Sequence, residues 1–272
     1  MANKIELKQH ELNDYQYEEA IKTLRTNIQF SGAGIQTVML TSALSDEGKS
    51  DITFHLSSSL ASLNKKILLI DADIRKSVFA SRYHLDTKVT GLSQYLSGQK
   101  VRDEIVYETN VPNLDIIFAG AYSPNPAELL EEELFTQLVL WAREQYDYIM
   151  IDTPPMANLI DGAIISQHCD GAILVIESGS TSYKLLQKVK VQLEKGGCRI
   201  LGAILNKVDM KENGYYYYGK YGRYGKYGGK YGKYGRYGGH DAPYGGPVPV
   251  RETLDPVEPE DNTDAIEDLN KL

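Results

Sequence analysis

The sequence predicts an α/β fold in which a doubly wound, mostly parallel β-sheet carries helices on both faces. Six short apolar segments alternate with helical patterns along the chain, which is the order of elements in a βαβ series. Several of these segments contain almost no polar residues, as strands do when helices bury both faces of a parallel sheet. The six segments are residues 37–40, 66–70, 114–118, 148–152, 172–176 and 200–205.

The composition is that of a cytoplasmic globular protein. The 272 residues can hold one domain of about 200 residues and additional segments. Cys169 and Cys198 lie in or beside apolar stretches and are interpreted as free thiols of a reducing compartment. No stretch approaches the roughly 18 apolar residues of a membrane span, and the first residues lack the apolar core of a signal peptide. We therefore expect membrane association only through a partner.

The beginning of the chain combines a polar segment with an amphipathic helix. Residues 1–14 are expected to form a flexible N-terminus. From residue 15 to residue 30 apolar side chains recur at helical spacing, which predicts a helix. On that helix Glu19, Lys22 and Arg25 lie three residues apart along one polar stripe. From the residues alone, this stripe is most simply a solvated face with weak intrahelical pairs.

The loop at residues 41–50 is the clearest functional motif. It joins an apolar strand to a helical pattern and ends in Gly-Lys-Ser, the arrangement of a P-loop that holds nucleotide phosphates. Lys49 would reach the β- and γ-phosphates, and the hydroxyl of Ser50 would bind Mg²⁺. Ala43 replaces the usual first glycine, so an ordinary strand–turn–helix stays an alternative. The residues expected around the nucleotide are Ser45, Asp46, Glu47, Gly48, Lys49, Ser50 and Asp51.

Carboxylates follow two further strands of the predicted sheet. One strand ends in Asp71 and Asp73, with Arg75 two residues further on, and another ends in Asp152. Ligands of parallel sheets gather at the carboxyl ends of the strands, so we expect these side chains to project toward the bound phosphates. An apolar strand that ends in Asp is the second half of a P-loop site, where the carboxylate binds Mg²⁺ directly or through water. Residues 127–145 predict one long helix between these strands.

The last predicted strand is followed by residues 206–209, Asn-Lys-Val-Asp. These residues match a pattern that reads guanine in GTPases. A GTPase would also carry Asp-x-x-Gly after the metal-binding Asp, whereas here Asp152 is followed by Thr-Pro-Pro. The alternative is a strand end at which Asn206 contacts any purine.

The chain changes character at residue 214. Residues 214–246 hold eleven of the 20 tyrosines, most of them in Gly-Lys-Tyr and Gly-Arg-Tyr units, and residues 215–244 carry six basic groups and one acidic group. Glycine at this density cannot build a core, so a disordered segment is predicted. The tract could stack on single-stranded nucleic acid or accept phosphate, and composition does not decide between them. Residues 247–272 are expected to be an acidic, disordered tail.

Together these motifs resemble the bacterial protein-tyrosine kinases, and more narrowly the stand-alone cytoplasmic kinases of Gram-positive capsule and exopolysaccharide systems. The resemblance covers residues 15–244 and includes the P-loop, Ile-Asp-Ala-Asp-Ile-Arg at 70–75, Ile-Asp-Thr-Pro-Pro at 151–155 and the tyrosine cluster. It implies a kinase domain at 15–213 that uses ATP and Mg²⁺ to phosphorylate tyrosines, mainly in the tail of a neighbouring subunit. The implied phosphoacceptors are Tyr215, Tyr216, Tyr217, Tyr218, Tyr221, Tyr224, Tyr227, Tyr231, Tyr234 and Tyr237.

The resemblance also assigns roles by position. Asp73 and Asp152 join Ser50 around Mg²⁺, and Asp71 accepts the proton of the tyrosine or orients its hydroxyl. Lys49, Arg75 and Asn206 act on the nucleotide. Such a transfer depends mostly on positioning and charge neutralisation.

Partners are implied in the same way. In this family a Glu-x-x-Arg-x-x-Arg helix packs subunits into a ring, and the corresponding residues here are Glu19, Lys22 and Arg25. Lys22 keeps the charge of the middle Arg but loses its bidentate fork. The resemblance further implies a membrane-embedded activator with a cytoplasmic tail, a cognate tyrosine phosphatase, no nucleic acid, and control of polysaccharide polymerisation and export at the inner face of the membrane.

Departures from the family pattern leave alternatives open. Asp51 stands where a Thr hydroxyl normally meets the α-phosphate, and with Asp46 it would repel a triphosphate unless Mg²⁺ or Arg75 offsets the charge. Weakened affinity, or an inactive scaffold, is therefore one hypothesis. A partitioning-type ATPase is another, although it would carry Lys at the position of Leu44 and lack the tyrosine tail. A nucleic-acid-binding ATPase would bind single strands in a salt-dependent way.

Overall fold

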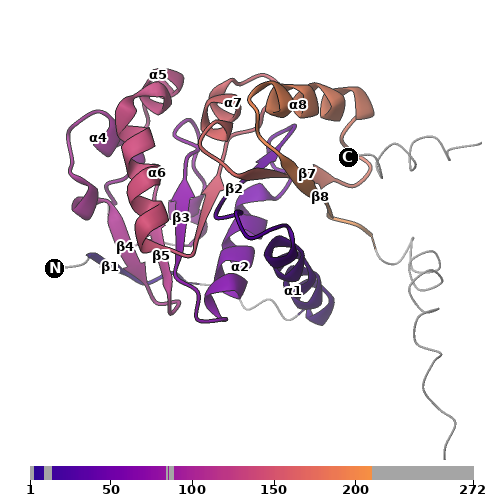
Figure 1. Cartoon of the computed structure of the whole chain (residues 1–272), viewed down its shortest axis with the longest axis horizontal. Helices are drawn as coiled ribbons and strands as arrows, with labels where there is room; N and C mark the ends of the chain where they lie inside the picture. Colours follow the sequence, from indigo (N-terminus) through magenta and orange to yellow (C-terminus); the bar gives the residue numbers. More distant parts are fainter. Residues whose placement is uncertain (1–2, 9–13, 84, 86–88, 210–272) are drawn as a thin grey trace, which may run out of the picture. The chain divides into compact units, whose positions relative to one another are not determined.

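A computed structural model describes residues 3–8, 14–83, 85 and 89–209. The chain divides into two units, Met1–Val208 and Asp209–Leu272, and the described residues belong to the first unit apart from Asp209. Within them an eight-stranded sheet has the order β1-β4-β5-β3-β6-β2-β7-β8 (Figure 1). Every neighbouring pair is parallel except β4 and β5. The predicted mostly parallel α/β fold is confirmed.

The strands match the apolar segments of the sequence, with two additions at one edge. Because the core strands are β-branched and apolar, they suit a pleated surface that is buried on both faces. The strands are β1 (Asn3–Ile5), β2 (Thr37–Ser42), β3 (Ile67–Asp71), β4 (Val106–Thr109), β5 (Leu114–Ile117), β6 (Tyr148–Asp152), β7 (Gly171–Glu177) and β8 (Ile200–Asn206).

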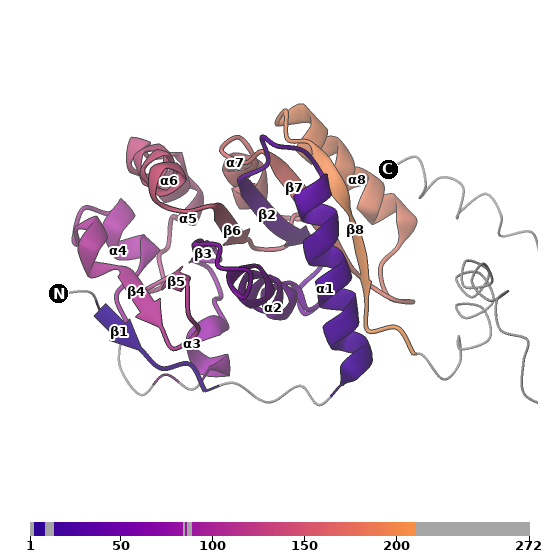
Figure 2. The same cartoon turned by 60° about the horizontal axis from the view of Figure 1, so that its bottom comes forward.

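Helices cover the two faces of the sheet unequally. Helices α1 and α2 lie on one face, and α5 to α8 lie on the other (Figures 1 and 2). The helices are α1 (Tyr15–Phe30), α2 (Lys49–Ala61), α3 (Phe79–Arg82), α4 (Leu92–Leu96), α5 (Pro126–Glu131), α6 (Glu133–Gln145), α7 (Asp161–Ser166) and α8 (Tyr183–Lys195), with one 3₁₀ turn at Arg102–Glu104.

Two apolar cores result, one on each face, and strand residues alternate between them. In β3, Leu68 and Ile70 belong to the core under α4 to α8, while Ile67 and Leu69 belong to the core under α1 to α3. All four side chains are fully buried. This period of two, with both faces apolar, is why the sequence reads as a continuous apolar run.

The N-terminal prediction was wrong for residues 3–8. Asn3–Ile5 forms β1, which pairs in parallel with β4, and Leu7 is only 2% exposed. The Leu7 backbone N–H donates to the side chain of Asn110 at 2.9 Å. Three residues, Asn-Lys-Ile, are too few to show the alternation of polar and apolar side chains by which a strand is predicted from the sequence. Strand β1 is held by backbone pairing with β4.

The single helix predicted at 127–145 is two helices, α5 and α6. Glu132 separates them in an extended conformation, with φ −62° and ψ 144°. The break lets Leu130 and Phe135, both with no exposed surface, reach the same core. The helical spacing of the leucines concealed this bend because each half keeps its own period.

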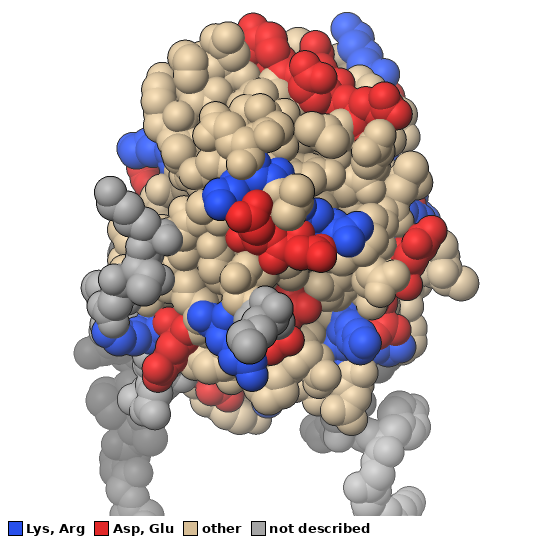
Figure 3. Space-filling view, turned by 90° about the vertical axis from the view of Figure 1, so that its left-hand side faces the viewer, with Lys and Arg blue, Asp and Glu red and all other residues tan. Residues whose placement is uncertain are grey.

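Three further features of the described residues concern the cysteines, the length of the helices and the surface charge. Cys169 and Cys198 form no disulfide, and burial raises the pKa of both thiols, that of Cys198 to about 11. None of the described helices combines the length and apolarity that crossing a bilayer requires. On the side that carries β1, β4 and α4, Lys and Arg lie among Asp and Glu (Figure 3). That face is therefore not a continuous basic surface for nucleic acid.

We expect Phe54→Ala to lower the free energy of unfolding by about 3–5 kcal/mol, because Phe54 is fully buried and the truncation leaves a cavity. Urea unfolding followed by circular dichroism measures the change. Phe30→Ala is the matched control: Phe30 is 83% exposed, and its loss should cost less than about 0.5 kcal/mol. Equal effects of the two substitutions would contradict the described packing of α2.

Candidate nucleotide-binding and active site

The candidate site lies where the carboxyl ends of β2, β3, β6 and β8 meet. The loop at 43–48 follows β2, Asp71 ends β3, Asp152 ends β6 and Asn206 ends β8. Asp71 and Asp152 are register partners on adjacent parallel strands. The sheet order therefore brings together the motifs that the sequence placed at separate strand ends, as expected for an open α/β sheet.

The loop has the conformation of an anion site. Asp46 and Gly48 have positive φ angles, 64° and 90°, and α2 begins at Lys49. Such turns aim successive backbone N–H groups into one concavity, and the start of a 13-residue helix adds its partial positive charge. Lys49 is only 7% exposed, and its positive charge opposes the rise in the pKa of Asp152. The arrangement suits the phosphates of a nucleotide.

Glu47 fixes the loop from within. Its side chain is 1% exposed and accepts hydrogen bonds from the Leu44 N–H at 2.7 Å and the Glu177 N–H at 3.3 Å. The hydroxyl of Thr181 also donates to it. The carboxylate that we expected to contact the nucleotide therefore anchors the loop to the end of β7 and to Thr181 beyond it.

The end of β8 provides a second anchor. The Asn206 side-chain amide donates to the Glu47 carbonyl at 2.9 Å, and the Lys207 ammonium donates to the Asp46 carbonyl at 2.7 Å. Lys207 also pairs with Glu177 at 3.1 Å. Asn206 and Lys207 thus stabilise the phosphate loop. In the guanine-reading pattern of GTPases these residue types would contact the base instead. Sequence reasoning missed Glu177 and Thr181, because nothing local marks them as neighbours of a loop more than 120 residues away. It noticed Lys207 only as part of the Asn-Lys-Val-Asp pattern and did not predict its contact with the loop.

Ser50 and Asp152 form the part of the site that suits Mg²⁺. The Ser50 hydroxyl donates to Asp152 Oδ2 at 2.5 Å, and the Thr53 hydroxyl lies 3.4 Å from Oδ1. A hydroxyl and a carboxylate in contact are a donor set that Mg²⁺ completes with waters and phosphate oxygens. The described residues contain no group of three or more His, Cys, Asp or Glu that could hold a metal alone. Burial raises the pKa of Asp152 to about 6, although Lys49 and Ser50 oppose the shift.

Asp71 is the most deeply buried carboxylate of the site. It has no exposed surface and accepts from the Asp73 N–H at 3.2 Å, the Ala119 N–H at 3.4 Å and the Ser77 hydroxyl. Burial, followed by the neighbouring charge of Asp152, raises its pKa well above the usual range. A carboxyl with a raised pKa binds a proton more readily, which suits a general base.

Asp73 and Arg75 lie in the turn that follows β3. Asp73 Oδ1 accepts from the Lys76 N–H at 2.9 Å, and its charge contributes to the raised pKa of Asp152. Arg75 makes a bidentate pair with the buried Asp161 at 2.6 and 2.9 Å. Arg75 therefore binds the first residue of α7. It does not offset the charge of Asp51, whose carboxylate contacts Arg82 instead.

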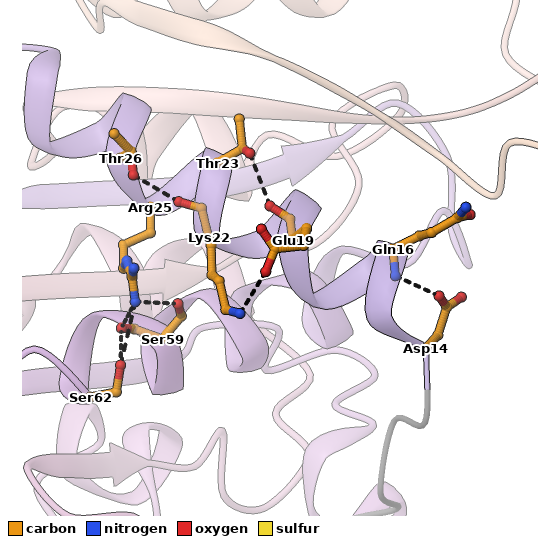
Figure 4. Close-up of polar contacts among 9 residues, drawn as sticks. All are labelled: Asp14, Gln16, Glu19, Lys22, Thr23, Arg25, Thr26, Ser59 and Ser62. Atoms are coloured by element: carbon orange, nitrogen blue, oxygen red, sulfur yellow. Dashed lines mark hydrogen bonds and ion pairs between the residues drawn. The ribbon is translucent and has the colours of Figure 1, made fainter. Parts of the chain in front are cut away.

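The polar stripe of α1 does not behave as one exposed face (Figure 4). Lys22 donates to Glu19 at 2.7 Å on the surface. Arg25 instead crosses to α2, where its Nη1 donates to the Ser59 carbonyl and hydroxyl at 3.2 Å and lies 3.4 Å from the Ser62 hydroxyl. Its Nε is buried without a partner among the described residues. Arg25 thus holds α1 against α2, and the outward-facing pair is Glu19 and Lys22.

The predicted acceptor tyrosines and one hollow of the structure are not part of this site. All predicted phosphoacceptor tyrosines, residues 215–237, fall outside the described residues. A hollow of about 400 Å³ lined by Lys66, Asp115, Trp141 and Tyr146, among others, lies at the amino ends of β3, β5 and β6, away from the phosphate loop. The candidate site is therefore recognised from backbone geometry and strand ends.

Comparisons with known proteins agree with this geometry. A family model described as an AAA domain matches residues 43–195. The tyrosine-protein kinase CpsD of Streptococcus agalactiae is 42% identical over 74% of this chain and 88% of that protein. The tyrosine-protein kinase YwqD of Bacillus subtilis (strain 168) is 38% identical over 76% of this chain and 87% of that protein. The kinase domain of the Escherichia coli tyrosine kinase ETK superposes with a TM-score of 0.69 at 29% identity, covering 75% of this chain and 89% of that chain.

We expect Asp152→Asn to raise the free energy of unfolding at pH 8 by about 1–3 kcal/mol in the absence of nucleotide and metal. The Asp152 pKa rises from 3.8 to about 6 on folding, so the folded protein binds this proton more tightly. The wild type therefore loses stability as pH rises from about 4 to 6, and the loss persists above that range.

Urea titrations between pH 5 and 8 with a chelator test this pH dependence. The advantage of Asp152→Asn should shrink toward pH 5. Asp147→Asn is the control of opposite sign, because the Lys66 N–H lowers the pKa of Asp147. If the Asp152→Asn protein is less stable than the wild type at pH 8, the claim that burial destabilises the ionised Asp152 is refuted.

We expect Gly48→Ala to weaken nucleotide binding by about tenfold or more, because the loop must distort. A Cβ at Gly48 would lie 2.1 Å from the Asn206 amide nitrogen, which holds the loop. Gly98→Ala is the matched control, since Gly98 also has a positive φ, 72°, but its Cβ would meet nothing within 4 Å. Calorimetric titration with ADP and Mg²⁺ compares the two, and equal affinities would contradict the described anchor.

Proposed function

The chain belongs to the bacterial tyrosine-protein kinases, and from this premise we propose that it transfers the γ-phosphate of ATP to the tyrosines of its own 214–246 segment, between subunits. Its enzymatic class follows from relatives named tyrosine-protein kinases at about 40% identity. The acceptor segment, the transfer between subunits and the biological output are our proposal.

One observation carries the proposal most directly. The anchored phosphate loop, the Ser50–Asp152 contact and the buried Asp71 converge at one edge of the sheet. A phosphoryl transfer needs an anion cradle, a cation-binding pair and a nearby group that takes the proton of the acceptor. These three parts are supplied by adjacent strands, which supports transfer to a hydroxyl over simple nucleotide storage.

Each residue has a distinct task in this proposal. The N–H groups of residues 45–50 and Lys49 bind the β- and γ-phosphates and neutralise their charge. Ser50 and Asp152, joined by Asp73, would hold Mg²⁺, which supplies charge neutralisation on the phosphates. Asp71 takes the proton of the incoming tyrosine hydroxyl. Because Asp71 has no exposed surface and also accepts from Ser77, access to its carboxylate must open when the acceptor arrives.

The acceptor and the partners follow from residues on the surface and in the tail. Six tyrosines between 221 and 237 each follow a Lys or Arg and precede a Gly, so they form a repeated and extended acceptor. Glu19 and Lys22 face outward on α1 and are proposed to contact a second copy in a ring. A membrane-embedded activator with a cytoplasmic tail, a tyrosine phosphatase and a role in capsule or exopolysaccharide assembly complete the proposal.

An inactive scaffold is the main competing function, and Asp51 is the observation that favours it. A carboxylate in the first turn of α2 opposes a polyphosphate. The scaffold would not need Lys49, whereas the kinase would. A partitioning-type ATPase is disfavoured by Leu44 at the position of the signature Lys.

We expect Lys49→Met to reduce phosphorylation by about a hundredfold or more, because it removes the buried cation of the phosphate loop. Intact-protein mass measured after incubation with ATP and Mg²⁺ should show steps of about 80 Da per phosphate in the wild type. The activator's cytoplasmic segment is added when it is identified. Lys65→Met, which removes an exposed cation at the amino end of β3, is the control and should keep the ladder.

Mixing two variants separates transfer between subunits from transfer within one. The first keeps the site but carries Phe in place of all tyrosines at 215–244, and the second is the full chain with Lys49→Met. Phosphate on the second protein supports transfer between subunits. If the wild type shows the mass ladder but the Lys49→Met protein gains no phosphate in the mixture, only the proposal of transfer between subunits is refuted. Hydrolysis of ATP by the wild type without any mass ladder would favour an ATPase.

A further inference from the structure

Asp51 is the one acidic residue in the first turn of α2, the turn that begins the proposed phosphate-binding helix. A carboxylate at a helix N-terminus is attracted by the same partial positive charge that attracts phosphate. It therefore competes with a nucleotide for that charge and also repels it directly. A site that binds ATP with Asp51 in this position needs a compensating cation nearby.

Arg82 is placed to be that cation. Its Nη1 donates to Asp51 Oδ1 at 3.0 Å, and the two side chains are 42% and 40% exposed. Arg82 belongs to α3, which follows the acidic end of β3. The pair therefore connects the start of the phosphate-binding helix to the segment after Asp71 and Asp73.

Aromatic packing holds Arg82 in this place. The next residue, Tyr83, packs against Phe54 of α2 with ring centroids 4.4 Å apart and against Phe79 of α3 at 5.8 Å. Phe54, Phe79 and Tyr83 are at most 5% exposed. An exposed ion pair normally loses much of its value to side-chain entropy. Here the backbone that carries Arg82 is fixed against α2, so less entropy is lost when the pair forms.

Other groups that face Asp51 do not supply this charge. His55 Nε2 lies 3.9 Å from Asp51, but burial lowers its pKa and favours the neutral ring at neutral pH. Burial raises the pKa values of Tyr17 and Tyr83, which keeps both phenols neutral. Arg75 is bound to Asp161. Among these described neighbours, the positive charge comes from Arg82.

We propose that Arg82 sets the affinity of the site for nucleotide phosphates by cancelling the charge of Asp51. This inference rests on the proposed nucleotide-binding function and deepens it. Arg82 is a positioning residue in this scheme: it acts through Asp51 and need not touch the nucleotide. The pair cancels the negative charge that Asp51 adds to the first turn of α2, as a Thr at position 51 would by carrying no charge.

The test is a charge series of four full-length proteins, titrated with ADP and Mg²⁺ by calorimetry at low salt. Arg82→Gln leaves Asp51 uncompensated and should weaken binding by about three- to tenfold. Asp51→Thr leaves Arg82 free and should bind more tightly than the wild type. The double variant restores neutrality and should return to within about twofold of the wild type. The Arg82→Gln defect should shrink at high salt because the interaction is screened.

Lys65→Gln is the matched control. Its ion pair with Asp147 has nearly the same exposure, 43% and 39%, but lies at the amino ends of β3 and β6. This variant should bind ADP as the wild type does. Thermal unfolding without nucleotide checks that the Arg82→Gln and double variants remain folded. Arg82→Lys, which keeps the charge, should retain most of the affinity.

Three results would overturn the proposal. Equal affinity of Arg82→Gln and wild type would mean that Asp51 is harmless without its partner. An Arg82→Gln defect of the same size in the Asp51→Thr background would mean that Arg82 acts independently of Asp51. Absence of ADP binding by the wild type would remove both this inference and the proposed nucleotide site, whereas the first two results leave that site intact.

Discussion

The structure depends on placing two carboxylates, Asp71 and Asp152, side by side at the ends of adjacent buried strands. Both are essentially without exposed surface, and burial raises the pKa of each. Such an arrangement opposes folding unless other groups compensate. Lys49, the Ser50 and Ser77 hydroxyls and the backbone N–H groups after β3 supply that compensation. The folded chain is thus prepared for the positive charge of a metal ion.

The phosphate loop is stabilised mainly by residues that come late in the chain. Glu47 receives hydrogen bonds from the last residue of β7 and from Thr181 after it, and the loop carbonyls receive them from Asn206 and Lys207 at the end of β8. The loop is therefore formed before any ligand binds, which reduces the entropy that binding must overcome. The same bonds connect nucleotide binding to the strand that leads into the tyrosine segment.

Charge pairing at this edge of the sheet is divided between two arginines. Arg75 is paired with the buried Asp161, and Arg82 is paired with Asp51 beside the phosphate-binding helix. An unpaired arginine near the phosphates would strengthen binding of any polyphosphate, whereas Arg82 in its pair with Asp51 offsets the repulsion from that carboxylate. At the other end of α2, Arg25 fixes α1 in place. Helix α1, whose polar stripe the family resemblance assigns to contacts between subunits, therefore also supports the phosphate-binding helix of its own chain.

The sequence by itself determined the features that have a local signature. The strands β2, β3, β5, β6, β7 and β8, the loop ending in Gly48-Lys49-Ser50 and the acidic strand ends follow from hydrophobic periodicity and short motifs, because these depend on neighbouring residues. Tertiary structure decided the rest. The pairing of β1 with β4, the break at Glu132, the use of Glu47 as an anchor and the choice of Arg82 as the partner of Asp51 each depend on packing between elements. The path of the backbone decides which of several similar charged side chains come into contact. Asp51 and Arg82 are 31 positions apart, so no local sequence pattern could reveal their contact.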